Sequence, residues 1–124
     1  MATMFALEED MTFYVYSEAV DMRCGIPKLY DLICASFPSV PFLTGKNVFI
    51  FFSRSRYLVK IIRYDSGGIL LYQKRLEHGT FELPEHDASD KSFIISYETL
   101  SFIMRGISLK SIKYRKRFRT DKDK

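Results

Sequence analysis

The cationic side chains in the middle of this chain could bind a polyanion. Residues 48–76 read as three apolar, extended segments joined by short turns, with Lys and Arg at the turns and along the segments. The cations concerned are Arg54, Arg56, Lys60, Lys74 and Arg75. Lys and Arg neutralise phosphate groups without reading a base sequence. We therefore predict that these residues, helped by Arg23, contact the phosphates of a nucleic acid. The alternative is a charged hairpin tip of the kind that many sheet proteins carry.

The C-terminal end is a second basic region. Residues 105–124 hold nine Lys or Arg and two Asp, a balance of +7, whereas the first 104 residues have a balance of −3. The tail cations expected to add non-specific affinity for nucleic acid are Lys113, Arg115, Lys116, Arg117 and Arg119. The alternative is that residues 110–124 are a flexible end that serves only solubility.

The residues that could perform catalysis are not arranged as catalysis requires. The two histidines of the chain are His78 and His86. Glu85, His86 and Asp87 are neighbours on a predicted loop, where adjacent side chains do not converge and no nucleophile is tied to them. No histidine–carboxylate cluster has the spacing of metal ligands. We therefore predict a protein without catalytic residues, metal ligands or a cofactor.

Length, composition and cysteine content limit the class of protein. With 124 residues, 47% of them hydrophobic and 15% aromatic, the chain is expected to form one folded domain over residues 1–109. Its longest apolar runs are far shorter than the ~20 residues that cross a membrane, so no membrane partner is predicted. Nine residues separate Cys24 from Cys34, which fits neither a redox pair nor half a zinc site. We expect both to be packing residues in a reducing compartment, the cytoplasm.

The apolar pattern predicts an α+β fold with two main helices. Residues 26–37 place apolar side chains at steps of three and four, which is typical of an amphipathic helix. Asp21 is expected to cap the start of this helix. Residues 97–105 repeat the pattern between Ser96, a preferred N-cap residue, and Gly106, which suits the position after a helix end.

The remaining segments predict an antiparallel sheet of four or five strands. One strand is expected at 12–17, a meander at 48–83 that ends in a short strand at 80–83, and a further extended piece at 93–95. The middle strand of the meander, residues 57–65, is apolar on both faces and should lie inside the sheet. Lys60 and Arg63 would then point to opposite faces.

Four short motifs occur in order between residues 12 and 109. The first is Val20-Asp21-Met22-Arg23 followed by Gly25, and the last is LSFIMRGI at Leu100–Ile107. Between them lie an F-x-F-x-x-R…K…D segment and a K-R-L-E-x-G-x-F segment, formed by Phe49, Phe51, Arg54, Lys60, Asp65, Lys74, Arg75, Leu76, Glu77, Gly79 and Phe81. Together these motifs resemble the accessory protein TnpB of the insertion-sequence-66 transposon family.

The resemblance implies a bacterial mobile-element protein that is encoded beside a separate transposase and needed for efficient movement. Catalysis would belong to that transposase. The chain departs from the family pattern at a few positions, where the family usually has Trp, Asn or a basic residue: Cys24, Ser53, Ser55, Tyr64 and Leu83. The two serines lower the charge of the predicted turn.

Two functions from different classes follow. The first is a non-enzymatic accessory factor that binds DNA at transposon ends and assists the transposase, with Tyr57 or Tyr114 able to stack on an unpaired base. The alternative is a protein-interaction module that binds the transposase, or another accessory protein, without contacting DNA. A nuclease would need convergent carboxylates, and the carboxylates within the motifs, Asp21, Asp65 and Glu77, fall at predicted turns and strand ends.

Overall fold

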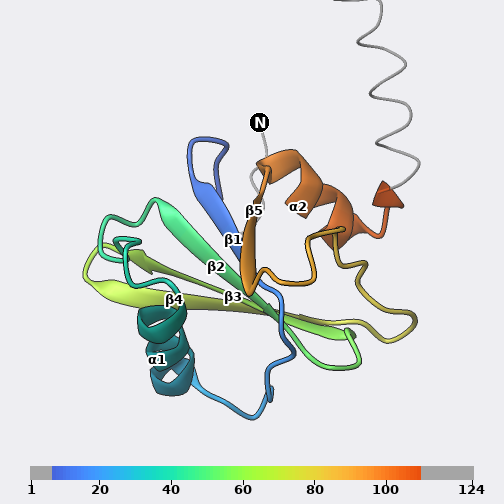
Figure 1. Ribbon diagram of the computed structural model, residues 1–124, viewed down its shortest axis with the longest axis horizontal. Coiled ribbons are helices and arrows are strands. Elements are labelled where there is room, and N and C mark those ends of the chain that lie inside the picture. Colours follow the sequence, from blue (N-terminus) through green and yellow to red (C-terminus); the bar gives the residue numbers. More distant parts are fainter. Residues whose placement is uncertain (1–6, 110–124) are drawn as a thin grey trace, which may run out of the picture.

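Two helices lie on opposite faces of a five-stranded sheet (Figure 1). The computed structural model describes residues 7–109. Its elements in chain order are β1 (Thr12–Tyr16), α1 (Ile26–Ser36), β2 (Asn47–Phe52), β3 (Leu58–Asp65), β4 (Gly68–Arg75), β5 (Ser92–Ile95) and α2 (Tyr97–Arg105). The order of the strands in the sheet is β4-β3-β2-β1-β5. The predicted α+β class is confirmed.

The prediction of a purely antiparallel sheet is wrong at one pair. β1 runs parallel to β2, whereas the three other neighbouring pairs are antiparallel. The reason is the connection, because the chain passes from β1 to β2 through α1, and a crossover helix returns the chain in the same direction. The meander β2-β3-β4, which is joined by short turns, is antiparallel as predicted.

A second correction concerns residues 80–83, which form no strand. The residues between β4 and β5 are a long connection instead. Phe81 within it is only 2% exposed and packs into the core under α2. The alternating apolar residues of this segment therefore reflect a loop that covers the sheet, which sequence alternation alone does not distinguish from a strand.

The two faces of the sheet carry separate cores. On one face, Leu100, Ile103 and Met104 of α2 pack on β-strand side chains such as Ile50 and Ile61. On the other face, Leu29 and Ile33 of α1 pack on a cluster rich in aromatic residues from β1, β2 and β3. Most of β2 and β3 is buried on both sides, which confirms β3 as an interior strand.

The helix ends agree with the expected chemistry in part. The Ser96 hydroxyl accepts a hydrogen bond from the Thr99 amide at 3.0 Å, and Gly106 adopts the left-handed φ of 78°. The expected cap of α1 by Asp21 is wrong, since Gly25 precedes this helix and no side chain caps it. Both cysteines were expected to be packing residues. Cys24 is half-buried, but Cys34 is exposed, so the expectation is wrong for Cys34.

Candidate nucleic-acid interface

The turn between β2 and β3 is the local structure that presents the predicted arginines. The Arg56 amide donates to the Ser53 carbonyl at 3.0 Å, and the Leu58 amide donates to the Ser53 hydroxyl at 3.2 Å. Arg56 has a φ of 62°, a left-handed conformation that non-glycine residues rarely adopt. The turn is therefore not extended, and strand alternation does not decide where Arg54 and Arg56 point.

The connection after β4 braces this turn. The Leu76 amide donates to the Tyr57 carbonyl at 2.8 Å, and the Phe81 amide donates to the Arg56 carbonyl at 2.7 Å. Because Phe81 is anchored in the core, the left-handed Arg56 is tied to a buried residue. The turn consequently holds its exposed side chains on a fixed backbone.

Three of the predicted cations line one open hollow beside this turn. Arg23 comes from the loop before α1, Arg54 from the turn, and Arg75 from the end of β4. We call this feature the basic hollow, and its complete lining is Val20, Asp21, Met22, Arg23, Ser53, Arg54, Ser55, Tyr57, Leu58 and Arg75. Its volume is about 550 Å³. Strand register explains the position of Arg75, because it pairs with Leu58 at the first residue of β3.

The cations of the hollow differ in their partners. The Arg75 guanidinium lies over the Tyr57 ring, 5.0 Å from its centroid, in a cation–π contact. Within residues 7–109, neither Arg54 nor Arg75 forms an ion pair with a carboxylate. Their charges are therefore available to an anion that enters the hollow.

Arg23 already has an acidic neighbour. Its guanidinium donates to both oxygens of the Asp21 carboxylate, with the shortest distance 2.7 Å. The hydrogen bonds from Arg23 hold the pKa of Asp21 well below its usual range. The Arg23 side chain nevertheless remains 91% exposed, so it is accessible although its charge is largely compensated.

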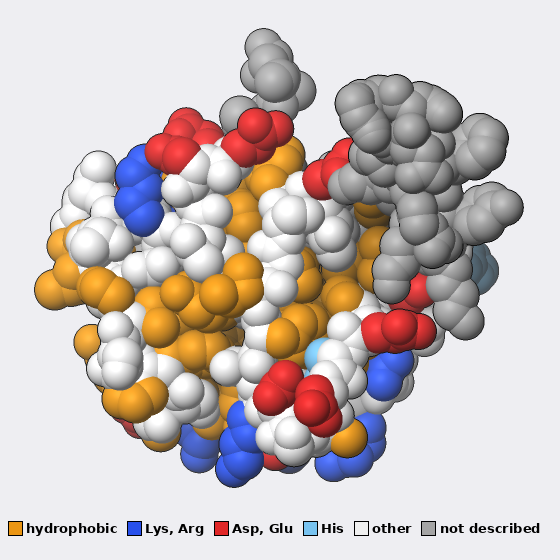
Figure 2. All heavy atoms as spheres, turned by 45° about the horizontal axis from the view of Figure 1, so that its top comes forward, with side chains coloured by type: hydrophobic (Ala, Val, Ile, Leu, Met, Phe, Trp, Pro, Cys, Tyr) orange, Lys and Arg blue, Asp and Glu red, His pale blue; other side chains and the backbone are white. Residues whose placement is uncertain are grey.

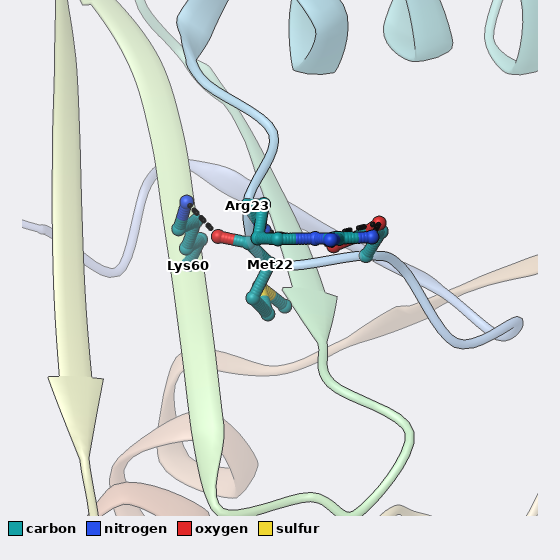
Figure 3. A network of polar contacts seen from close by, with 4 residues as sticks. Met22, Arg23 and Lys60 are labelled. Carbon is teal, nitrogen blue, oxygen red and sulfur yellow. Dashed lines mark hydrogen bonds and ion pairs between the residues drawn. The ribbon is translucent and has the colours of Figure 1, made fainter.

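Lys60 lies inside the molecule and not in the basic hollow. Its side chain is 6% exposed, and its ammonium donates to the carbonyl oxygens of Met22 at 2.9 Å and Cys24 at 2.7 Å. Figure 3 shows the Lys60 ammonium directed at the Met22 carbonyl, while Arg23 extends away from it. This placement does not support the predicted phosphate contact. Lys60 fastens the loop that carries Arg23 to β3.

Lys74 has a corresponding role on the opposite face. Its ammonium donates to the Met104 carbonyl oxygen at 2.9 Å, near the C-terminal end of α2. The carbonyls of a last helical turn lack partners within the helix and favour a positive charge. Lys74 therefore stabilises the end of α2, and its geometry does not support the predicted phosphate contact either.

The predicted cations do not form one continuous strip. Arg56 is exposed beside the basic hollow but is not part of its lining. Lys113, Arg115, Lys116, Arg117 and Arg119 lie outside the described residues. The arrangement within residues 7–109 is thus a local cationic site of Arg54 and Arg75, with Arg56 and the paired Arg23 next to it.

Sequence reasoning missed the structural role of the two lysines. A signal was present for Lys60, which interrupts an apolar run that was expected to be buried on both faces. A lysine in such a place needs acceptors for its ammonium. The same need applies to Arg63, which is also 6% exposed. Its guanidinium donates a hydrogen bond to the carbonyl oxygen of Tyr64 on the same strand, at 3.3 Å.

The candidate acid–base residues take structural positions in the described part of the chain. His86 stacks on Phe93 with ring centroids 4.5 Å apart, and its Nδ1 lies 3.0 Å from the Pro84 carbonyl oxygen. No group of three or more His, Cys, Asp or Glu within residues 7–109 is placed to hold a metal ion. None of the helices in this range is long and apolar enough to cross a membrane.

Comparison with known proteins agrees with the motifs. A family model described as IS66 Orf2 like protein matches residues 11–114. The uncharacterized protein y4hO of Sinorhizobium fredii is 34% identical over 99 residues, which cover 80% of this chain and 83% of that relative. No solved structure matches. The resemblance to the accessory proteins of insertion-sequence-66 transposons is thereby confirmed.

Proposed function

The chain belongs to the family of IS66 Orf2 like proteins, and we propose that it is an accessory factor for transposition that binds nucleic acid. It binds through the basic hollow and assists a separate transposase. The observation that carries this proposal is the convergence of Arg54 and Arg75 in one hollow without an acidic partner among residues 7–109. Strand cleavage and joining are assigned to the transposase, and no catalytic step is assigned to this chain.

The proposal has a quantitative consequence for salt dependence. Each phosphate that a protein neutralises releases counterions, and log K falls with log salt with a slope of about −0.9 per phosphate on duplex DNA. Arg54, Arg56 and Arg75 would therefore contribute a slope of roughly −2.7. Any cation of residues 110–124 that takes part makes the slope steeper.

The test is a titration of labelled transposon-end DNA at several salt concentrations, followed by fluorescence anisotropy. We expect Arg54→Gln and Arg75→Gln each to weaken binding and to reduce the salt slope by about one. Lys46→Gln is the matched control, because it removes one exposed charge that precedes β2, whereas Arg54 follows that strand.

The results distinguish a wrong binding site from the absence of nucleic-acid binding. If wild type binds and the two arginine variants behave like the Lys46→Gln control, the basic hollow is not the binding site. If wild type fails to bind even at low salt, the nucleic-acid role is rejected. The first conclusion requires that the Lys46→Gln control bind like wild type, and both conclusions require circular dichroism spectra of folded protein.

A second candidate function is supported by the opposite edge of the sheet. β5 is an edge strand, and Ile94 within it is 62% exposed. Ile94 also lines a groove whose other apolar residues include Phe37 and Val40, from the segment that follows α1. Figure 2 shows hydrophobic side chains gathered over one face of the molecule. An edge strand with an exposed apolar side chain can pair with another chain.

This candidate is a protein-interaction module that binds the transposase. Ile94→Lys should abolish co-purification with the transposase in the absence of DNA, while the DNA titration stays unchanged. Leu43→Lys is the control, because Leu43 is also a large exposed apolar residue, 68% exposed, but lies in the loop before β2. Equal co-purification of both variants with the transposase would remove this candidate.

A further inference from the structure

The basic hollow combines two kinds of surface. Its lining includes the apolar residues Val20 and Leu58, each 6% exposed, and Met22. Tyr57 also lines the hollow, and its side chain is unusually open for an aromatic residue, at 38% exposed. The cationic groups are thus accompanied by an aromatic face, which a phosphate alone does not require.

We infer that the basic hollow takes a nucleotide of an unpaired strand, with the base on the Tyr57–Arg75 pair and its phosphate at Arg54. This inference rests on the proposed function and specifies its ligand. In a duplex the faces of the bases are covered by their neighbours, and a protein reaches mainly phosphates and base edges. Only an unpaired strand offers a base face and a phosphate together, and sites for such strands combine a cationic groove with exposed aromatic rings.

The backbone that carries the Tyr57 ring is held by hydrogen bonds within the protein. Its backbone carbonyl accepts the Leu76 amide, and the preceding Arg56 is tied to Phe81. The guanidinium of Arg75 lies 5.0 Å from the ring centroid and contacts the ring in a cation–π interaction. A base that stacks here therefore meets a pre-ordered surface, which reduces the entropy lost on binding.

The one acidic group in the hollow does not oppose this arrangement. Asp21 lines the hollow, but its carboxylate is bound by the Arg23 guanidinium. The uncompensated charges are those of Arg54 and Arg75, so the electrostatic attraction for a phosphate is centred between the turn and the end of β4. This is also where Tyr57 lies, since it follows the turn directly.

The chain offers a direct optical test because it contains no tryptophan. Tyr57→Trp introduces a single tryptophan in the hollow, whose emission can be excited separately from that of the remaining tyrosines. The probes are an oligothymidylate of about ten nucleotides, within the usual site sizes, and a hairpin duplex with the same number of phosphates, closed by a non-nucleotide linker so that it has no unpaired base. We expect the oligothymidylate to quench the tryptophan emission through stacking and to bind at least tenfold tighter than the hairpin.

Affinity measurements on two further variants complete the test. Tyr57→Ala should weaken oligothymidylate binding by about 5- to 150-fold, the range that corresponds to one stacked base. It should weaken hairpin binding much less, because a duplex offers no base face to the ring. Tyr57→Phe keeps the ring and should bind like wild type. Thermal melting of each variant verifies folding, and the quenching experiment remains decisive if Tyr57→Ala is unstable.

Each outcome has a defined meaning. Tight hairpin binding without quenching, together with unchanged affinities for Tyr57→Ala, overturns the inference but leaves the proposed function in place. Absence of binding to both probes overturns the inference and the proposed function together. Stronger binding of the oligothymidylate with quenching, lost on Tyr57→Ala, supports the inference.

Discussion

Substitution of Lys60 by methionine should destabilise the protein by removing a buried clamp. The ammonium of Lys60 donates to two carbonyl oxygens of the loop before α1, at 2.9 and 2.7 Å. Hydrogen bonds to a charged group contribute about 1.5–3 kcal/mol each. Part of this is offset, because the variant no longer buries an ammonium. We expect a net loss of about 2–3 kcal/mol in the free energy of unfolding.

The assay is chemical and thermal denaturation followed by circular dichroism. For a domain of about 100 residues, each kcal/mol shifts Tm by roughly 4–8 °C, so Lys60→Met should lower Tm by at least about 8 °C. Lys46→Met is the control, since its ion pair with Asp10 is exposed and should matter little.

The result also separates a structural lysine from one that contacts nucleic acid. An unfolding free energy within about 0.5 kcal/mol of wild type, the usual range for a surface change, would refute the clamp. If such a stable variant also lost DNA affinity, the phosphate contact predicted from the sequence would be restored. A destabilised variant that binds normally when folded supports the geometry described above.

The remaining predictions concern a backbone contact and a surface ion pair. Gly45 and Gly79 both have a φ of 77°, but a Cβ on Gly45 would lie 2.9 Å from the Tyr64 carbonyl oxygen, whereas Gly79 faces open space. Gly45→Ala should therefore lower Tm clearly more than Gly79→Ala, and equal shifts in calorimetry would contradict this. The hydrogen bonds from Arg23 lower the pKa of Asp21, so its contribution to stability is present at neutral pH and is lost as pH falls through the lowered folded-state pKa. Titration by NMR should place the Asp21 midpoint below the ordinary 3.8. Arg23→Gln should raise this midpoint toward 3.8 without reaching it, because the backbone amide of residue 23 still donates to the carboxylate. A wild-type midpoint near 3.8 would show that the pair does not form in solution.

Local chemistry made most of the elements predictable. Ser96 and Gly106 mark the ends of α2 because each satisfies a need of the backbone at that one position. The alternation and apolar runs of residues 48–75 predict the meander, since its strands are neighbours in sequence and joined by turns. Thr12–Tyr16 alone does not specify which strand lies beside it. The signal for the parallel β1–β2 pair was the helix predicted between the two strands, which the antiparallel prediction did not use.

The same limit applies to the site. Lys60 and Arg54 are both cations of one motif in the sequence, and strand periodicity assigns neither of them a partner. Their difference arises from a loop more than 30 residues away in the chain, whose carbonyls meet Lys60 at β3. Arg75 and Tyr57 come together because Arg75 pairs with Leu58, the residue after Tyr57, in the register of β3 and β4. The sequence alone does not specify this register.

The strand order has a consequence for how the molecule assembles. β5 has β1 as its sole neighbour in the sheet of residues 7–109, so the segment that leads into α2 is joined to the meander through the first strand. The meander strands β2, β3 and β4 can pair through local contacts. In contrast, β1 reaches β2 only across α1, and β5 pairs with β1 across most of the chain. β5 therefore completes the sheet only after β1 has docked, and loosening of β1 would leave β5 without a strand to pair with.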